Sequence, residues 1–488
     1  MRQMIDGPLT FHVGQRAQDA GLDHAVVRGT LELALRIGEA MLSLGAGAAD
    51  VTAMVHRTTR VFCLDSCQVE VNFTAITVSY DPGGANPPLT LMRVVRTRIS
   101  DYGRLAQIIE LATDLGAEVV PYDAALGKLE EAHLSLDEIV QAPRPYRRLV
   151  VTGVLSVLAA AVAVLLGGGL NVALVAAATT AIIDRVVWKL DRWGLPPFFV
   201  QGTGAAIATL VAVGLYLVAP HLSIDLGAFP PSLVVASGIV VLLAGTSLVG
   251  AAEDAISGHA VTAGGRTFEV VMLTLGIVIG IGGVLDVARR AGVPLEVLDI
   301  PANSASPIVQ AVSAAVVAAA WGLASYARPR AAVAAAIAGG TAWTIFMAAR
   351  ELGLGPAAAS GVAALVIGFL GEYLGPRVRV PPILISVCGI VPLLPGLAIY
   401  RALFQLVNEP QTGLSPGVAG LLGAAMSGVA LAAGVTLGEF FAAPLRRGAH
   451  RRHESNADWP TENPDLDRSD PEDLEEDAVL DRGESVRL

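Results

Sequence analysis

Residues 237–245 read SGIVVLLAG, and residues 389–396 read GIVPLLPG. At an offset of 151 residues, the two glycines, the Ile-Val pair and the Leu-Leu pair of these stretches align. A Pro-Pro pair just upstream of each stretch aligns as well, without a gap. The alternative is a chance likeness between two helices rich in Leu, Val and Gly, but chance seldom keeps so many positions in register. We therefore expect an internal repeat.

The composition indicates a membrane protein. Of the 488 residues, 53% are hydrophobic and 16% are charged, and the mean hydropathy is +0.59. A soluble protein carries about a quarter charged residues. Nearly all of the net charge of −11 lies after His453. This predicts a disordered acidic C-terminal tail, residues 446–488, that is solvated or binds a basic partner. No basic patch suggests a nucleic-acid partner.

Ten apolar segments are long enough to cross a bilayer, and they fall into two sets of five. The first set lies in residues 146–290 and the second in residues 300–445. The expected spans are Leu149–Leu166, Leu170–Trp188, Phe198–Ala219, Pro231–Val249, Phe268–Ala288, Ile308–Tyr326, Ala331–Ala349, Gly355–Leu374, Pro382–Leu403 and Gly417–Ala443.

An odd number of spans in each set means that the second set enters the membrane from the opposite face. We therefore expect two inverted five-helix repeats, an arrangement typical of secondary transporters, which bind substrate between the repeats near the membrane centre. Arg and Lys are concentrated in the segments on one side of the spans. By the positive-inside rule, both termini of this multi-pass protein are expected on the cytoplasmic side of the cell membrane, with lipid around the spans. A homo-oligomer remains open.

The spans are preceded by a segment of soluble character. After a flexible N-terminus of residues 1–27, which lacks the apolar stretch of a signal peptide, residues 28–145 are expected to form a small cytoplasmic α/β domain. Apolar spacing predicts helices at residues 28–44, 50–63, 100–115 and 123–133, with Ser100 as an N-cap, and strands at residues 69–73, 76–80 and 89–95.

The repeated stretches offer candidate substrate contacts. Pro392 and Pro395 interrupt the ninth span, because each removes a backbone donor and clashes with the preceding turn. Helix ends at such a break offer N–H groups to a carboxylate and carbonyls to a cation, although a proline kink also serves packing alone. The small residues of the fourth span suit a polar path and close helix packing equally. The predicted substrate-binding residues are Ser237, Gly238, Gly245, Thr246, Ser247, Pro392, Pro395, Gly396, Tyr400 and Arg401.

Titratable residues follow the fourth span, in the stretch EDAISGHAVTAGGRTFEV that begins at Glu253. The equivalent stretch after the ninth span carries no such carboxylate pair. One titratable group at one gate can couple proton movement to substrate release, whereas the plain alternative is a solvated cytoplasmic turn. We predict Asp254 as the proton-coupling group. The predicted residues of this gate are Asp254, Glu253, Arg266, Glu269 and Thr262.

Motifs of enzymes are missing from the sequence. No GxxxxGK[ST], GxSxG or HExxH stretch occurs, and neither the three cysteines nor the eight histidines show metal-ligand spacing. An enzyme would have to use Asp50, His56, Asp65 or Ser66, whose spacing matches no catalytic motif. We therefore expect no enzyme, no metal and no cofactor, with the proton motive force as the energy source.

The longer motifs resemble a known family. Five stretches look like motifs of the threonine/serine exporter family and occur in the same order as in that family. They are AVLLGGG, GLPPFF, ASGIVVLLAG, DAISGHAVTAGGRTFE and PPILISVCGIVPLLPGLAIYR. The similarity runs from about Arg28 to Glu439. It implies a ten-span carrier that exports small hydroxy amino acids with the proton motive force. Matching positions are Asp254, Thr262, Arg266, Glu269, Pro392, Pro395, Gly396, Tyr400 and Arg401.

The leading hypothesis is thus a secondary transporter that exports threonine and serine, driven by the proton motive force. A dicarboxylate exporter of the same fold is one alternative, because some relatives are linked to dicarboxylates. A membrane-anchored hydrolase that uses the N-terminal domain is another, since that domain of the family has been thought hydrolase-like.

Overall fold

The computed structural model describes residues 24–83, 87–95, 98–116, 120, 124–218, 230–243, 245–293, 305–378, 380–408 and 416–454. Residues up to Ala443 belong to one compact unit, and those from Pro444 onward to a second. Of the predicted disordered tail, residues 446–454 continue a helix, and the residues after Glu454 lie outside the described part of the chain, as do residues 1–23.

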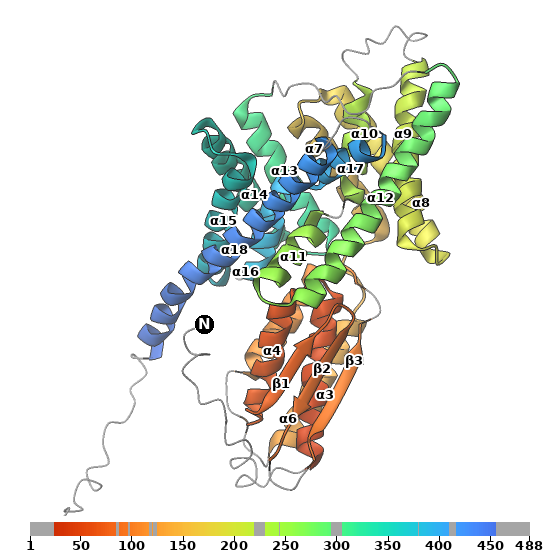
Figure 1. Ribbon diagram of the computed structural model, residues 1–488. Helices are drawn as coiled ribbons and strands as arrows, with labels where there is room; N and C mark the ends of the chain where they lie inside the picture. The colour runs from red at the N-terminus through yellow and green to blue at the C-terminus, as the bar shows by residue number, and fades with distance from the viewer. Residues whose placement is uncertain are drawn as a thin grey trace, which may run out of the picture. The chain divides into compact units, whose positions relative to one another are not determined.

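The N-terminal segment, residues 24–141, combines a three-stranded sheet with four helices. Strands β1 (Cys67–Val71), β2 (Ala75–Tyr80) and β3 (Leu89–Val94) pair antiparallel in that order. Helices α3 (His24–Ser43) and α4 (Ala48–Val61) pack against the strands, and α5 (Tyr102–Leu115) and α6 (Ala125–Gln141) pack against α3. Figure 1 shows the strands side by side with these helices behind them. The alternation of β2 buries Ile76, Val78 and Tyr80 toward the helices.

Two local predictions in this segment were wrong. Asp101 rather than Ser100 caps α5, because its carboxylate accepts the backbone N–H of Arg104 at 3.0 Å. Helix α6 continues to Gln141 instead of ending at His133, since no Gly or Pro interrupts the chain before Pro143.

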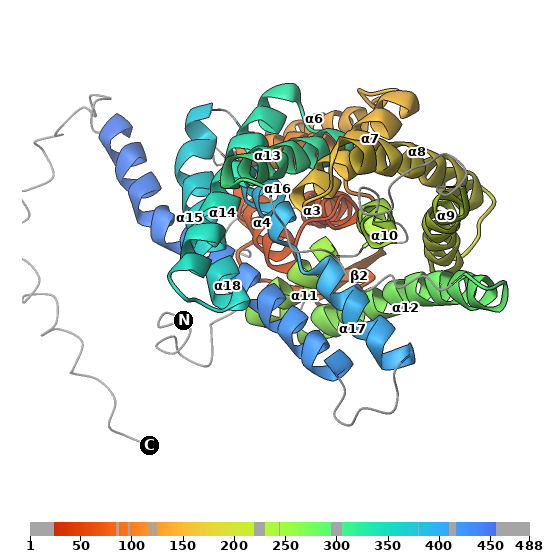
Figure 2. The same cartoon turned by 90° about the horizontal axis from the view of Figure 1, so that it is seen from above.

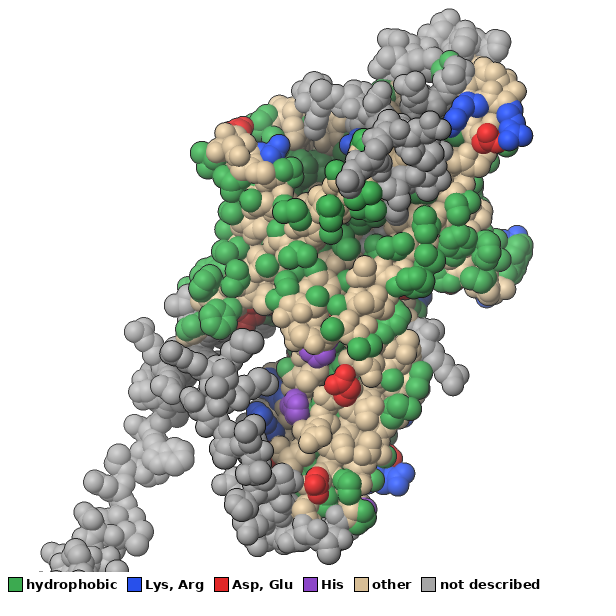
Figure 3. Space-filling model, in the orientation of Figure 1, with side chains coloured by type: hydrophobic (Ala, Val, Ile, Leu, Met, Phe, Trp, Pro, Cys, Tyr) green, Lys and Arg blue, Asp and Glu red, His purple; other side chains and the backbone are tan. Residues whose placement is uncertain are grey.

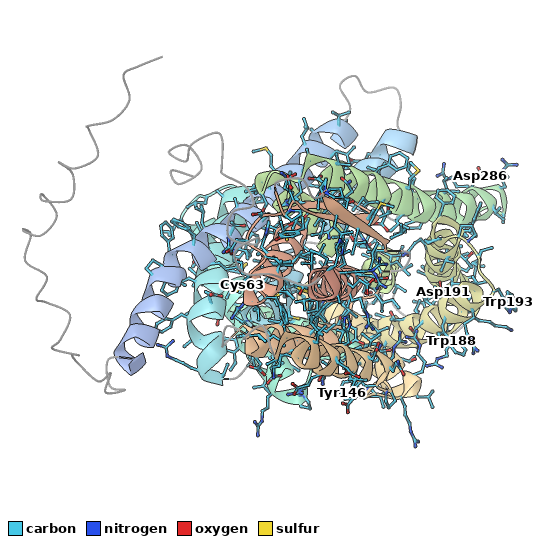
Figure 4. The ribbon with its side chains drawn as sticks, turned by 90° about the horizontal axis from the view of Figure 1, so that it is seen from below. Cys63, Tyr146, Trp188, Asp191, Trp193 and Asp286 are labelled. Carbon is cyan, nitrogen blue, oxygen red and sulfur yellow. The ribbon has the colours of Figure 1, made fainter. Side chains whose placement is uncertain are left out.

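Eight helices of the described chain are long and apolar enough to cross a membrane. They are α7 (Arg148–Leu165), α8 (Leu170–Arg192), α9 (Pro197–Val218), α12 (Ala260–Arg290), α13 (Pro307–Ala324), α14 (Pro329–Glu351), α15 (Pro356–Val378) and α18 (Pro416–Glu454). Large apolar side chains cover their outer surface, as Figure 3 shows, and Leu170 and Ile308 are 75% and 76% exposed. In Figure 4, Trp188 and Trp193 lie at the outer edge of the bundle near the end of α8. Together these features describe a multi-pass membrane protein.

Two further segments are broken helices. Helix α10 (Pro231–Ile239) runs into the 3-10 turn η3 (Val240–Leu242) and then α11 (Gly245–Ile256), with a bend of 51° between the two helices. Helix α16 (Pro382–Ile390) runs into η4 (Val391–Leu393) and then α17 (Gly396–Asn408). The sequence indicated a break in the ninth span only, so the break in the fourth span was not predicted. If α10 and α11 together make one crossing, the described chain has nine; ten spans remain a prediction.

Glycines bring the helices of each half into backbone contact. A Cβ atom on Gly280 of α12 would lie 2.1 Å from the carbonyl oxygen of Gly202 on α9, and one on Gly438 of α18 would lie 2.2 Å from that of Leu365 on α15. Both positions belong to a Gly-xxx-Gly pair, which allows close helix approach in membranes. Seen from above in Figure 2, α10 lies inside an arc of α7, α8, α9 and α12.

Candidate functional site

The two helix breaks have the same backbone geometry. Leu243 follows η3 with φ −72° and ψ 130°, and Leu394 follows η4 with φ −60° and ψ 132°. These two leucines are related by the offset of 151 residues. Each leucine therefore leads the chain out of a 3-10 turn in extended backbone, and the next helix begins two residues later, at Gly245 or Gly396.

Proline explains only one of the two breaks. Pro395 biases Leu394 toward extended backbone, and Pro392 lies inside η4. The first break contains Val241 and Ala244 at the equivalent positions, so it forms without proline. A cause common to both breaks must lie elsewhere, and the packing of the two breaks supplies it.

The two breaks cross each other in a reciprocal way. A Cβ atom on Gly245 would lie 3.0 Å from the Cβ atom of Leu394, and a Cβ atom on Gly396 would lie 3.0 Å from the Cβ atom of Leu243. Any larger residue at either glycine would have to displace the opposing leucine. We call these four residues the crossing.

Most predicted substrate-binding residues are packed in this conformation. The Ser237 hydroxyl is buried and donates to the carbonyl oxygen of Leu233 at 2.6 Å. Gly238 packs against Ala208 and Thr179, and Pro392 packs near Gly339.

The remaining predicted substrate-binding residues are partly accessible or start helix α17. Thr246, Ser247 and Arg401 are half-buried. The carbonyl oxygen of buried Pro395 accepts the N–H of Ile399 at 3.0 Å. The side chain of Tyr400 lies outside the described part of the structure.

Asp254 and Arg266 hold the N-terminal segment. They form a buried ion pair at 3.1 Å, with 1% and 7% of the residues exposed. The Asp254 carboxylate also accepts the N–H of Ala48 at 2.9 Å, at the start of α4, and Arg266 donates to the carbonyl oxygen of Ala46 at 3.0 Å. Thr262 donates to the carbonyl oxygen of Val71 at 3.0 Å. We call Asp254, Thr262 and Arg266 with these three backbone groups the clasp.

Helix α12 can reach this segment because of its length. Its 31 residues span about 46 Å, which exceeds a hydrocarbon core of about 30 Å. Glu269 lies further along the same helix, half-buried, and interacts electrostatically with Arg98 of the N-terminal segment. Arg98 in turn stacks over Phe73 at 4.2 Å from the ring centroid. Phe73 packs against Gly265, where a Cβ atom would lie 2.7 Å from the ring.

A second set of contacts joins the N-terminal segment to the turn between α13 and α14. The backbone N–H of Tyr102 donates to the carbonyl oxygen of Ser325 at 2.9 Å, and the hydroxyl of Tyr146, in the link between this segment and α7, donates to that of Ala327 at 2.9 Å. The N-terminal segment therefore contacts both sets of membrane helices, through the clasp on α11 and α12 and through this turn.

Further carboxylates face the region beside the clasp. Asp50 on α4 interacts electrostatically with Asp254 and with Glu372 on α15. Glu439 on α18 interacts with Asp50, Glu253 and Glu372, and accepts a hydrogen bond from Ser386 at 3.4 Å. Desolvation, followed by repulsion from Asp254 and Glu372, raises the pKa of Asp50, although its side chain is exposed.

Sequence reasoning missed this grouping. It assigned Asp254 and Glu253 to the gate and considered Asp50 only for catalysis, and it gave Glu372 and Glu439 no functional role. The available signal was the occurrence of two carboxylates inside apolar helices of the second half. No group of three or more His, Cys, Asp or Glu side chains in the described ranges is arranged to hold a metal ion.

The chain matches known proteins along most of its length. Residues 32–288 match the family model ThrE, described as "Putative threonine/serine exporter", and residues 310–441 match a second model, described as "Threonine/Serine exporter, ThrE". The probable threonine/serine exporter of Mycobacterium tuberculosis is 39% identical over 447 residues, which cover 90% of this chain and 81% of the relative. The threonine/serine exporter of Corynebacterium glutamicum is 35% identical over 431 residues, covering 87% and 85%.

These relatives are named as exporters and not as enzymes. No solved structure matches the chain. Because the first family model alone covers more than half of the chain, and both relatives align over most of their own length, the chain belongs to the threonine/serine exporter family.

Proposed function

We propose that this protein exports threonine and serine across the cell membrane as a ten-span carrier with inverted repeats, driven by the proton motive force. The observation that carries the proposal is the pair of helix breaks with one geometry and one sequence offset, in a chain of this family. Broken helices at membrane depth are the usual substrate sites of carriers built from such repeats.

The substrate is proposed to bind beside the crossing. The contact of Leu243 with Gly396, and of Leu394 with Gly245, leaves no room between the breaks themselves. Thr246 and Ser247 open α11 next to the crossing and are half-buried, so their hydroxyls suit a hydroxy amino acid. The N–H groups at this helix start favour a carboxylate. Arg401 on α17 is the proposed cationic partner. Gly238, Gly245 and Gly396 are proposed to allow close helix packing and not to contact the substrate.

Proton coupling is proposed at the cytoplasmic end, around Asp254 and the carboxylates that face it. A group of carboxylates cannot all stay charged in a partly desolvated region, so one proton bound among them stabilises the group. Arg266 neutralises Asp254 in the present conformation. Opening of the clasp would leave that carboxylate free to take up a proton.

The test is efflux of radiolabelled threonine from proteoliposomes with an imposed pH gradient. Wild type is expected to show efflux that depends on the gradient. Asp254→Asn and Glu439→Gln are expected to lose this dependence, and at least one should still exchange threonine for threonine. Asp286→Asn is the matched control. Asp286 also pairs with an arginine, Arg290 at 2.8 Å, but this ion pair is exposed and both of its residues lie on α12. If folded wild type moves no threonine, the proposed substrate is wrong.

A further inference from the structure

The crossing is converted into itself when the two halves of the sequence are exchanged. Adding 151 to Leu243 gives Leu394, and adding 151 to Gly245 gives Gly396. The contact of Leu243 with Gly396 therefore corresponds to the contact of Leu394 with Gly245 when the two halves are exchanged. A local two-fold axis must pass between the two contacts.

The surroundings of the crossing share this property. Val240 of η3 and Val391 of η4 are again 151 residues apart, and both pack into one apolar cluster. The core of that cluster comes from Leu158, Ala161 and Val162 on α7 and from Val317 and Ala320 on α13, the first helix of each half. These two helices also pack directly against each other. The axis is thus occupied by apolar side chains that both halves supply.

An inverted-repeat carrier changes the side that it opens when its two halves exchange conformations. Contacts away from the axis then break or change partners. The two contacts of the crossing lie about the axis and are converted into each other by this exchange. Both end states of the transport cycle can therefore keep them. Contacts made by one half alone, such as the clasp, have no such equivalent.

We propose that Leu243, Gly245, Leu394 and Gly396 form the fulcrum of the transport cycle, a contact that stays closed while the halves move about it. This inference rests on the proposed function, since it needs a carrier with inverted repeats. The glycines are then required because only a hydrogen atom lets each leucine reach the opposite helix start. The leucines act as positioning residues that keep the two helix starts at a fixed separation.

The main experiment joins the crossing covalently. In a variant without the native cysteines, Leu243→Cys/Gly396→Cys places two Cβ atoms 3.0 Å apart, so the two positions need to separate only slightly to reach the spacing of about 3.5–4.5 Å found in disulfides. Threonine exchange is measured in proteoliposomes before and after oxidation. The fulcrum predicts that the disulfide forms and that the oxidised and reduced carriers exchange at rates within about twofold. The equivalent pair, Gly245→Cys/Leu394→Cys, must give the same result.

A steric experiment tests the same contact without cysteine. Gly396→Val is expected to slow exchange at least tenfold per folded carrier while the KM for threonine stays the same, because the movement and not the binding is impeded. Leu243→Gly removes the Cβ atom that the new side chain meets and should restore the rate, whereas Leu394→Gly should not, since Leu394 contacts the other glycine.

The outcomes separate the two proposals. A disulfide that forms and stops exchange until reductant is added would show that the crossing opens, and would overturn the fulcrum. The same holds if neither pair forms a disulfide, or if both leucine variants rescue equally. Parent protein that moves no threonine in the same assay would contradict the proposed substrate, while disulfide formation in both pairs would still establish the crossing.

Discussion

Arg266 links several parts of the molecule through one guanidinium group. It pairs with Asp254, donates to Ala46 and lies so close to Gly250 that a Cβ atom there would be 2.6 Å from its Nη1 atom. The ion pair and its hydrogen-bond partners are buried. Removing one of the two charges therefore leaves the other buried without a counter-charge, and this destabilises the fold by more than the ion pair stabilises it. The clasp therefore has a structural role whether or not Asp254 also carries a proton.

A double variant separates these roles. Asp254→Asn alone leaves Arg266 buried without a counter-charge and is expected to lower the free energy of unfolding by about 3–5 kcal/mol. Asp254→Asn/Arg266→Gln removes both charges, keeps polar groups at both positions and should recover most of that loss in a thermal unfolding assay. If its threonine efflux still follows the pH gradient, Asp254 is not the coupling group. If the double variant is no more stable than the single one, the ion pair does not hold the clasp.

Asp50 predicts a pH effect of definite sign. Desolvation raises its pKa above the ordinary value of 3.8, so the folded protein binds this proton more tightly than the unfolded chain. This group therefore costs the folded state stability as the pH rises from about 4 through the raised pKa. Asp50→Asn should make the protein more resistant to heat than wild type at pH 7–8, with a difference that shrinks toward pH 4. Asp65→Asn is the control substitution, because Asp65 lies outside the group of carboxylates that interact with Asp50; an equal gain there would contradict the argument.

At the scale of elements, the sequence repeat carried more information about the two helix breaks than the prolines did. Pro392 and Pro395 indicated a break in the ninth span, and the structure has one. The break in the fourth span was missed because that span contains no proline near its middle. The gap-free alignment of Gly245 with Gly396 was the available signal, since equivalent sequences adopt equivalent folds. Local rules about single residues could not show that each glycine faces a leucine of the other half, because these contacts join residues about 150 positions apart in the sequence.

The first break therefore predicts the behaviour of the second. If the crossing maintains both breaks, Pro392→Ala/Pro395→Ala should keep the break at Leu394, fold normally and retain threonine exchange within about threefold. A stability loss of about 1 kcal/mol is expected from the lost ring atoms beside Gly339. The measurement is exchange per folded carrier. A loss of exchange beyond tenfold in folded protein would show that proline itself maintains the site.

At the scale of the whole molecule, composition and apolar length predicted the membrane class and most helix positions, because the cost of unpaired backbone groups in lipid leaves few alternatives. The way the N-terminal segment attaches was not predictable. Its contacts join Ala48 to Asp254 and Tyr102 to Ser325, residues more than 200 positions apart. Such pairings depend on tertiary packing, which no local pattern records.

The three cysteines offer a direct test of the proposed orientation. Cys63 in the N-terminal segment is exposed, whereas Cys67 and Cys388 are buried, so a bulky maleimide should label Cys63 in the folded protein. The positive-inside rule places this segment in the cytoplasm. In intact cells, a membrane-impermeant maleimide should therefore leave the protein unlabelled, and labelling should appear when the membrane is opened and disappear in Cys63→Ser. Labelling of Cys63 in intact cells would reverse the topology. It would also place Asp254 and the clasp on the outer side, where protons enter, so that the same carboxylates would have to couple in the opposite direction.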